Sequence, residues 1–487
     1  SYLNGVHDRR TLQYVEPGYG YPESGQVVTN VTNGKLIRLL VDDEPFDVTY
    51  GRLDAHEWCL DFRDGVLHRR TDWVSPSGCA VRVSSTRLVS LVQRSIGAIR
   101  YQVEALDRPV RLVVQSELVA NEALPAPPPG DPRAGQPELP PLIAKEHAAK
   151  GTRAGLVHST TNSGLCIAAV MEHVVDGPAG TAVASETFPH LGRVTITAEL
   201  KPGDRLRLDK FVAYGWSGHR SLPAVRDQAD AALAGAQQTG WDGLRTAQRA
   251  FLDEFWSRAD IELDGDTEIQ HAVRFALFHI LQAGARAEGR AIPAKGLTGP
   301  GYFGHSFWDT EAYVLPVLTQ VAPDAAAHAL RWRHSTLPLA TARAAQLGLA
   351  GAAFPWRTIH GEECSSYWPA GTDAFHINAA VADAVIRYCD TTADDAFERE
   401  VGVELLAETA RLWMSLGHHD VDGRFRIDGV TGPDEYSAVA DNNVYTNLMA
   451  QQNLRGAADS AARHPDRARA LGVDDAETAR WRNAAEA

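Results

Sequence analysis

The 487-residue sequence has few cysteines, and their spacing excludes two classes of small stabilised domain. There are five, an odd number, and no pair has the Cys-x-x-Cys spacing of a zinc or redox site. Neither a disulfide framework nor a zinc centre is therefore indicated. We expect buried free thiols in a reducing compartment, which predicts a cytoplasmic location. The five are Cys59, Cys79, Cys166, Cys364 and Cys389.

Long apolar runs and an excess of basic charge are also missing. No run of eighteen or more apolar residues occurs, so no membrane-spanning helix is predicted and no membrane partner is expected. The net charge of -15 argues against a nucleic-acid partner, because binding to phosphates requires a basic face. The N-terminus lacks the basic and apolar regions of a signal peptide. A hydrophobic content of 44% and this length indicate a globular chain of two or three domains.

Residues 1–217 carry the pattern of an all-β domain. Short alternating or β-branched runs are separated by turn residues such as Pro202-Gly203, and no helical periodicity intervenes. This pattern predicts an N-terminal antiparallel β-sandwich. The clearest strands are expected at Lys35–Val41, Arg111–Val114, Arg193–Glu199 and Arg205–Val212. Leu124–Pro141 contains Pro-Pro-Pro-Gly and is expected to form a long exposed loop, conceivably a lid.

From residue 222 onward the hydrophobic pattern changes to a period of 3.6 residues. Residues 222–260 predict two helices within a linker at 218–262. Asp266 or Thr267 is expected to cap the next helix, whose apolar stripe is Ile269, Val273, Ala276 and Ile280. Residues 263–487 thus form an α/α region, and periodicity leaves toroid, solenoid and bundle open. Further helices are expected at about 309–321, 324–346, 374–390, 395–416, 443–462 and 475–487.

The segment Lys295–Glu311 is the first of three that are rich in sugar-binding groups. Its glycines allow tight turns or close approach of a ligand. Trp308 could offer an apolar face to a pyranose ring, and Asp309 could accept hydrogen bonds from its hydroxyls. A core tryptophan and a helix-capping aspartate are the alternative.

The second segment runs from Phe354 to Glu363 and continues to Asn378. It crowds aromatic and charged side chains into one loop, which favours the wall of a pocket over a solvated loop. His376 opens a helix and is interpreted as a structural histidine. The side chains that carry the argument are Trp356, Arg357, His360, Glu362, Tyr367 and Trp368.

The third segment, Thr431–Tyr436, places Asp434 and Glu435 directly after a Gly-Pro turn. Asp441–Asn447 follows, with many hydrogen-bonding side chains at the start of a probable helix. Alone, the carboxylate pair would be a solvated acidic turn. A metal reading of the nearby cluster is disfavoured, because adjacent histidines on a helix end point apart. That cluster comprises His418, His419, Asp420 and Asp422.

Taken together, these segments resemble glycoside hydrolase family 65, whose members are phosphorylases of maltose, trehalose and kojibiose. The resemblance implies an N-terminal β-sandwich, a helical linker, an (α/α)6-barrel and a small C-terminal β-domain. It is carried, in order and spacing, by Gly301–Glu311, Pro355–Glu363, Tyr367–Thr372, His376–Asn378, Thr431–Tyr436 and Asp441–Asn447, with Leu60–Leu67 in the sandwich.

The resemblance also implies roles for individual residues. Glu435 would be the general acid that protonates the departing glycosidic oxygen, with Asp434 and partial burial raising its pKa. The substrate-binding residues would be Trp308 and Asp309 in the glucosyl subsite, with Trp356, Arg357 and Glu362 near the sugar. Inorganic phosphate would be the co-substrate, with no cofactor or metal, and the enzyme would be a homodimer. An inverting hydrolase and a non-catalytic carbohydrate-binding paralogue are the alternatives.

The sequence departs from the family pattern in two respects. Ala379–Val381 replaces the Ala-Asp-Ile that usually follows His-x-Asn, so a polar contact is expected to be lost. The chain also ends before the Lys-Gln glucosyl-binding pair and the Ser/His phosphate-binding loop, and it starts inside the usual sandwich. We therefore expect a chain truncated at both ends, with an incomplete barrel at 263–487.

Overall fold

The computed structural model describes residues 1–14, 16, 18–122, 141–285, 287–367 and 369–487. Its described residues form two compact units. The first, called here the sandwich unit, comprises described residues within 1–8, 29–122 and 141–275; the second, the helical unit, comprises those within 9–28 and 276–487. The helical unit thus takes in an early stretch of the chain, which carries β2.

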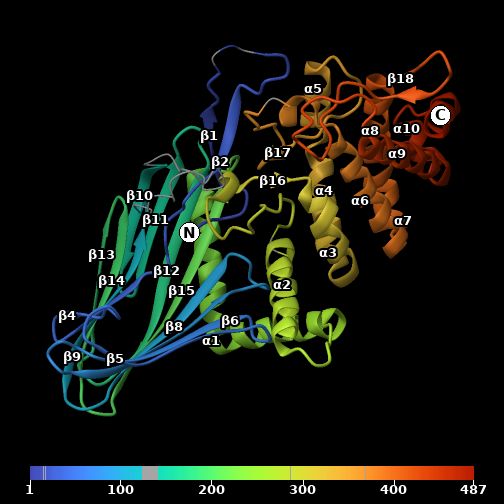
Figure 1. Cartoon of the computed structure of the whole chain (residues 1–487). Helices are drawn as coiled ribbons and strands as arrows, with labels where there is room; N and C mark the ends of the chain where they lie inside the picture. Colours follow the sequence, from blue (N-terminus) through green and yellow to red (C-terminus); the bar gives the residue numbers. More distant parts are fainter. Residues whose placement is uncertain (15, 17, 123–140, 286, 368) are drawn as a thin grey trace. The chain divides into compact units, whose positions relative to one another are not determined.

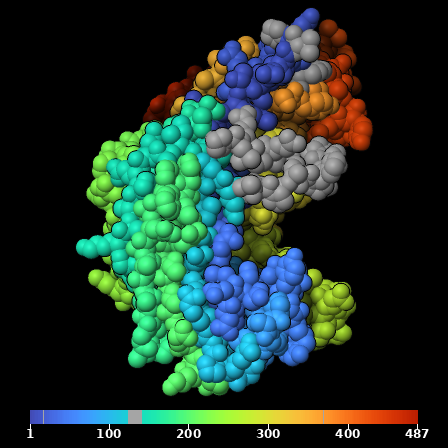
Figure 2. Space-filling model, turned by 90° about the vertical axis from the view of Figure 1, so that its left-hand side faces the viewer, coloured from blue at the N-terminus to red at the C-terminus, as the bar shows by residue number. Residues whose placement is uncertain are grey.

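The sandwich unit contains two antiparallel sheets (Figure 1). The larger has the strand order β10-β11-β12-β15-β8-β7-β6-β5 and the smaller the order β13-β14-β9-β3-β4. Their strands lie side by side in blue to green in Figure 2. The bounds are β3 (Ile37–Val41), β4 (Glu44–Pro45), β5 (Arg52–Asp61), β6 (Val66–Val74), β7 (Ala80–Val89), β8 (Ile96–Ala105), β9 (Val110–Val119), β10 (Leu142–Lys150), β11 (Arg153–Thr160), β12 (Cys166–Asp176), β13 (Ala182–Phe188), β14 (Leu191–Leu200) and β15 (Arg205–Ser217).

Alternation of side chains explains the sandwich. In β14 every second residue is buried, including Val194 and Ile196, which join Leu112 and Val114 of β9 in one core cluster. One face of each sheet is thereby removed from water, as expected for strands of period two. The predicted sandwich is confirmed, and the four expected strands correspond to β3, β9, β14 and β15. The loop expected at Leu124–Pro141 lies almost wholly outside the described residues.

Helix α1 (Leu222–Ala259) covers the outer face of the larger sheet. Its stripe of Val225, Ala229 and Leu233 shares a cluster with Ala168 and Ala213 of that sheet. Gly240 has a φ of 69°, a value that glycine adopts without the clash of a Cβ, and it kinks the helix. The two helices expected at 222–260 are therefore two arms of one kinked element.

Helix α2 (Thr267–Ala285) begins where it was expected. Asp266 caps it, because its Oδ1 accepts hydrogen bonds from the backbone N–H groups of Glu268 and Ile269, each at 3.0 Å. The predicted apolar stripe is wrong as a buried face: Ile269 is 53% exposed. Leu277, Phe278, Leu281 and Gly284 are buried instead, in the second half of the helix.

The expected helices of the C-terminal region form, several of them opening or broken by a wide π-helical turn. The bounds are η1 (Gly301–Gly304), η2 (Thr310–Val314), α3 (Leu315–Val321), α4 (Pro323–Ser335), α5 (Leu337–Gln346), η3 (Pro369–Asp373), α6 (His376–Thr392), α7 (Asp395–Phe397), η4 (Glu398–Gly402), α8 (Val403–Leu416), α9 (Val444–Arg463), α10 (Pro465–Ala470) and α11 (Asp475–Glu486). The described chain thus has the predicted β-then-α order.

Three two-stranded pairs complete the fold: β1 (His7–Thr11) with β2 (Ser24–Val28), β16 (Ser306–Phe307) with β17 (Arg357–Thr358), and β18 (His418–His419) with β19 (Phe425–Arg426). All five cysteines are free, as expected, but only Cys79 and Cys364 are buried; Cys166 and Cys389 are half-buried, and Cys59 is exposed on an edge strand. No helix formed by the described residues is both long and apolar enough to cross a membrane.

Candidate active site

The acidic turn at Thr431–Tyr436 is carried by a closed loop that ends at α9. Val430 and Ala440 exchange backbone hydrogen bonds of 3.0 and 2.9 Å across the neck of this loop. The Thr431 hydroxyl donates to the carbonyl of Ala438. Gly432 is required here, because a Cβ would lie 2.5 Å from the Asn443 side chain. The loop therefore holds its tip in a defined position although the tip itself is exposed.

This loop is connected to Trp308 through His376. The backbone carbonyl of Thr431 lies 3.1 Å from Nδ1 of His376, whose ring meets the Trp308 ring edge-on at 4.9 Å between centroids. Tyr445 of α9 closes the group at 6.2 Å from Trp308. The structure thus brings together the first and third segments singled out from the sequence.

Glu435 interacts electrostatically with Asp309, the residue that follows Trp308. Partial burial and the Asp309 charge raise the pKa of Glu435 above its ordinary value. The expected direction and one of its two expected causes, partial burial, are therefore found, but the neighbouring charge is that of Asp309 and not that of Asp434. Asp434 is turned into the loop, where its Oδ1 accepts the backbone N–H of Tyr436 at 3.1 Å.

Two buried polar atoms, one on α6 and one on α9, have no hydrogen-bond partner among the described residues. They are Nε2 of His376 and Oδ1 of Asn447. Because Nδ1 of His376 meets a carbonyl, it carries the proton, and Nε2 is an acceptor. Burial lowers the pKa of His376 to about 4, so the ring is neutral at pH 7. Buried acceptors of this kind are suited to ligand hydroxyl groups.

Trp356 lies next to this group and is held in place by Glu363, which was not among the predicted site residues. Its ring packs edge-on against Phe307 at 5.0 Å, and its backbone N–H donates to Oε2 of Glu363 at 2.6 Å. Glu363 also accepts the N–H groups of Cys364 and Ser365, at 2.9 and 2.7 Å. Burial raises its pKa to about 7. Glu363 is thus the internal anchor of the Trp356 loop.

Glu362 is directed away from Glu363, toward the segment that contains β2. Its Oε2 accepts Nε2 of Gln26 at 2.5 Å and lies 3.4 Å from His360. The hydrogen bond from His360 lowers the pKa of Glu362 to about 2. Arg357 belongs to the same side, with its Nε 2.7 Å from Nδ1 of His305. Of the predicted residues, Trp308, Asp309 and Glu435 are therefore gathered, and Trp356 borders them.

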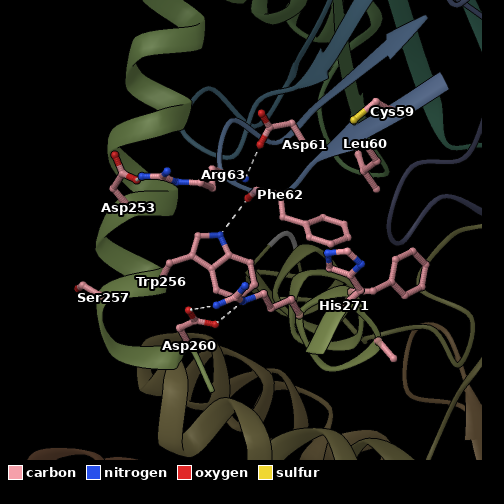
Figure 3. Close-up of a pocket in the computed structure, with 13 residues that line it drawn as sticks. Cys59, Leu60, Asp61, Phe62, Arg63, Asp253, Trp256, Ser257, Asp260 and His271 are labelled. Carbon is pink, nitrogen blue, oxygen red and sulfur yellow. Dashed lines mark hydrogen bonds and ion pairs between the residues drawn. The ribbon is translucent and has the colours of Figure 1, made fainter. Parts of the chain in front are cut away.

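A separate cavity lies in the sandwich unit between β5, α1 and α2 (Figure 3). It encloses about 1020 Å³, yet none of the predicted site residues lines it. Its charged groups pair with each other: Arg274 contacts Asp260 at 2.7 and 2.6 Å, and Trp256 donates to the carbonyl of Phe62 at 2.9 Å. These contacts between lining residues give its walls a structural role.

His418 and His419 form β18, one of the two strands of a short hairpin. Asp420 accepts the backbone N–H groups of Asp422 and Arg424 at 2.9 Å each, and the Arg426 guanidinium lowers the pKa of its carboxyl. Among the described residues, no group of three or more histidine, cysteine, aspartate or glutamate side chains could hold a metal ion. Trp368, part of the second predicted segment, lies outside those residues.

Comparison with known families assigns this chain. Residues 1–255 match the N-terminal domain of glycosyl hydrolase family 65, and residues 274–487 match its central catalytic domain. The chain belongs to glycosyl hydrolase family 65, as its motifs predict.

Individual relatives agree. The chain is 58% identical, over all of its length and 62% of the relative, to an uncharacterized glycosyl hydrolase of Mycobacterium tuberculosis. It is 34% identical, over all of its length and 64% of the relative, to alpha,alpha-trehalose phosphorylase of Thermoanaerobacter brockii. A solved structure from the human microbiome, provisionally named a kojibiose phosphorylase, superposes with a TM-score of 0.89 at 24% identity and shares the fold. The superposition covers 100% of this chain and 63% of the chain in that structure.

Proposed function

We propose that the protein to which this chain belongs is an inverting disaccharide phosphorylase, in which Glu435 is the proton donor. The supporting observation is that burial and the charge of Asp309 raise the pKa of Glu435, whose loop meets His376 through the Thr431 carbonyl, while the His376 ring packs edge-on against Trp308. The chain spans less than two thirds of the length of these relatives, so the complete activity belongs to the proposal. The name of the 34% identical relative makes α,α-trehalose the first substrate to test.

The chemistry follows from these positions. A sugar ring would lie against Trp308, with its hydroxyl groups on Asp309 and on the open acceptors of His376 and Asn447. Glu435 would protonate the glycosidic oxygen as the bond breaks. Phosphate would attack the anomeric carbon from the opposite face, which gives β-glucose 1-phosphate without a carboxylate base. Because the pKa of Glu435 is raised, its acid form persists to a higher pH than that of an ordinary glutamate.

The decisive experiment is phosphate-dependent release of β-glucose 1-phosphate from α,α-trehalose, maltose and kojibiose. Glu435→Gln should reduce turnover by roughly a thousandfold, the order expected for loss of general acid catalysis, without changing thermal unfolding. Glu400→Gln, an exposed glutamate of η4, is the matched control and should keep wild-type turnover. Turnover of Glu435→Gln equal to that of the control would exclude Glu435 as the acid.

The two alternatives give different readouts in the same experiment. An inverting hydrolase on this scaffold would release glucose at equal rates with and without phosphate. A non-catalytic paralogue would bind a disaccharide, measured by calorimetry, and turn over none of the three. The phosphorylase is favoured over both only if product formation requires phosphate.

A further inference from the structure

Three basic side chains gather around the turn that precedes Trp308. The Arg10 guanidinium carbon lies 4.1 Å from the centroid of the Phe303 ring, and that of Arg357 lies 5.5 Å from the same centroid. The Lys295 ammonium lies 5.8 Å from the neighbouring ring of Tyr302. All of these residues belong to the helical unit. This concentration of positive charge is unexpected in a chain whose net charge is -15.

None of these cations is paired with a carboxylate in the part of the chain that the structure describes. Arg357 is half-buried, and its Nε donates to Nδ1 of His305, whose Nε2 donates to the Gln26 carbonyl at 2.6 Å. Glu362 is engaged by Arg9, Gln26 and His360. A partly buried guanidinium without a carboxylate still has N–H groups that suit an anion.

The backbone beneath the cations adopts a conformation that side-chain-bearing residues rarely take. Tyr302 and Phe303 have φ values of 52° and 56°, in the left-handed region, and Gly304 follows at 74°. A Cβ at Gly304 would meet Val28 of β2 at 2.4 Å, so the turn lies directly against the segment that bears Arg10. Consecutive residues in this region are strained, and such strain persists where function requires the geometry. Here it sets the Phe303 ring beside both guanidinium groups.

We propose that Arg10 and Arg357, beside Phe303, form a binding subsite for a phosphate group. Phe307 pairs with Arg357 across β16 and β17 and directly precedes Trp308, so the subsite adjoins the sugar-binding wall. Two sources fit the shared chemistry: inorganic phosphate, and a phosphate ester carried by a sugar. The role of the subsite in turnover rests on the proposed function, whereas its binding of phosphate does not.

The test is equilibrium binding of inorganic phosphate, glucose 6-phosphate and glucose to the chain, measured by calorimetry at low ionic strength. Arg10→Met and Arg357→Met should each weaken phosphate-group binding by roughly tenfold to a hundredfold, as expected for loss of a charge-assisted hydrogen bond. Arg331→Met is the matched control, because Arg331 also lies over an aromatic ring, that of Phe397 at 5.2 Å. That variant should bind like the wild type, and Arg10→Met should bind glucose as the wild type does.

The outcomes separate the sources. If Arg10→Met and Arg357→Met both weaken the binding of inorganic phosphate, the ligand of the subsite is free phosphate. If they weaken only the binding of glucose 6-phosphate, the ligand is a phosphate ester. Absence of binding by either probe, or equal binding by wild type and variants, overturns the subsite. Thermal unfolding checks that each variant is folded, and Arg10→Met decides the question if Arg357→Met is not. Glu435→Gln should retain the anion, so failure of the phosphorylase proposal would leave this result intact.

Discussion

The sandwich unit and the helical unit each bury a basic side chain, one fully and one partly, and they do so in opposite ways. Lys210 in β15 is fully buried, and its Nζ donates to the carbonyls of Leu36 and Glu117 at 3.2 and 3.0 Å. Glu117 in turn pairs with Arg38 and Arg193. Arg357 in β17 has a neutral histidine and two aromatic rings as its neighbours.

The difference shows what each burial achieves. Around Lys210 the hydrogen-bonding capacity of the protein is used internally, and burial lowers the pKa of the amine to about 7. Around Arg357 the described residues place no carboxylate within ion-pair distance, so the guanidinium keeps N–H groups for a further partner. A buried charge with internal partners supports the fold, whereas a buried charge without a counter-charge indicates a ligand. Three predictions test this distinction, in order of the expected change in the free energy of unfolding.

The first concerns Lys210. Its folded-state pKa lies below that of an unfolded lysine, so the unfolded chain binds more protons between about pH 7 and 10. The free energy of unfolding of the sandwich unit should therefore rise across this range, by about 4 kcal/mol. Lys210→Met should remove the rise, measured by urea denaturation as a function of pH. The same slope in the variant would show that other groups cause it.

The second prediction concerns Glu363, a buried carboxyl of the helical unit that can be compared with buried Lys210 of the sandwich unit. Its folded-state pKa of about 7 lies above that of an unfolded glutamate, so the folded chain binds more protons between about pH 4.5 and 7. Its contribution is complete below pH 4.5 and is lost as the pH rises through 7, by about 3 kcal/mol. Glu363→Gln should flatten this dependence in denaturation experiments. Glu400→Gln, which is exposed, should leave it unchanged.

The third prediction has the smallest expected change in the free energy of unfolding. It tests whether Arg357 differs from Lys210 in supporting the fold. Arg357→Met should change the free energy of unfolding by about 1 kcal/mol or less, because relief from burying a charge offsets the lost cation–π and histidine contacts. A loss comparable to that expected for Lys210 would mean that Arg357 supports the fold. Thermal unfolding of Arg357→Met beside Arg331→Met measures this directly.

The sequence predicted what depends on local pattern. Alternation predicted β14, and the Asp266 cap and the order of the helices were visible in the spacing of polar and apolar residues. The motif segments predicted the gathering of Trp308, Asp309 and Glu435, because family resemblance carries information on contacts between distant segments. The stripe of α2 was misassigned, because periodicity shows that a helix has an apolar side but not what covers it.

What the sequence could not show were choices between neighbours and contacts over long separations. Glu362 and Glu363 are adjacent and chemically identical, yet Glu363 accepts the backbone N–H of Trp356 within its own loop, whereas Glu362 contacts Gln26. Glu435 and Asp434 differ in the same way, since the charge of Asp309 acts on Glu435, whereas Asp434 is turned into its own loop. The pairing of Arg357 with Phe307 joins residues fifty positions apart and has no signal in either segment. Arg10 was not singled out, because nothing in its own surroundings predicts Phe303 as a neighbour.

The two-residue ladder between β16 and β17 has a thermodynamic consequence. It ties the strand that directly precedes Trp308 to the strand that carries Arg357, so a ligand that orders one loop would also act on the other. Linkage requires that coupling between two binding equilibria be reciprocal. If a bound phosphate group changes the affinity for a sugar at Trp308 by some factor, a bound sugar must change the affinity for the phosphate group by the same factor. Sugar and anion would then be recognised as a pair.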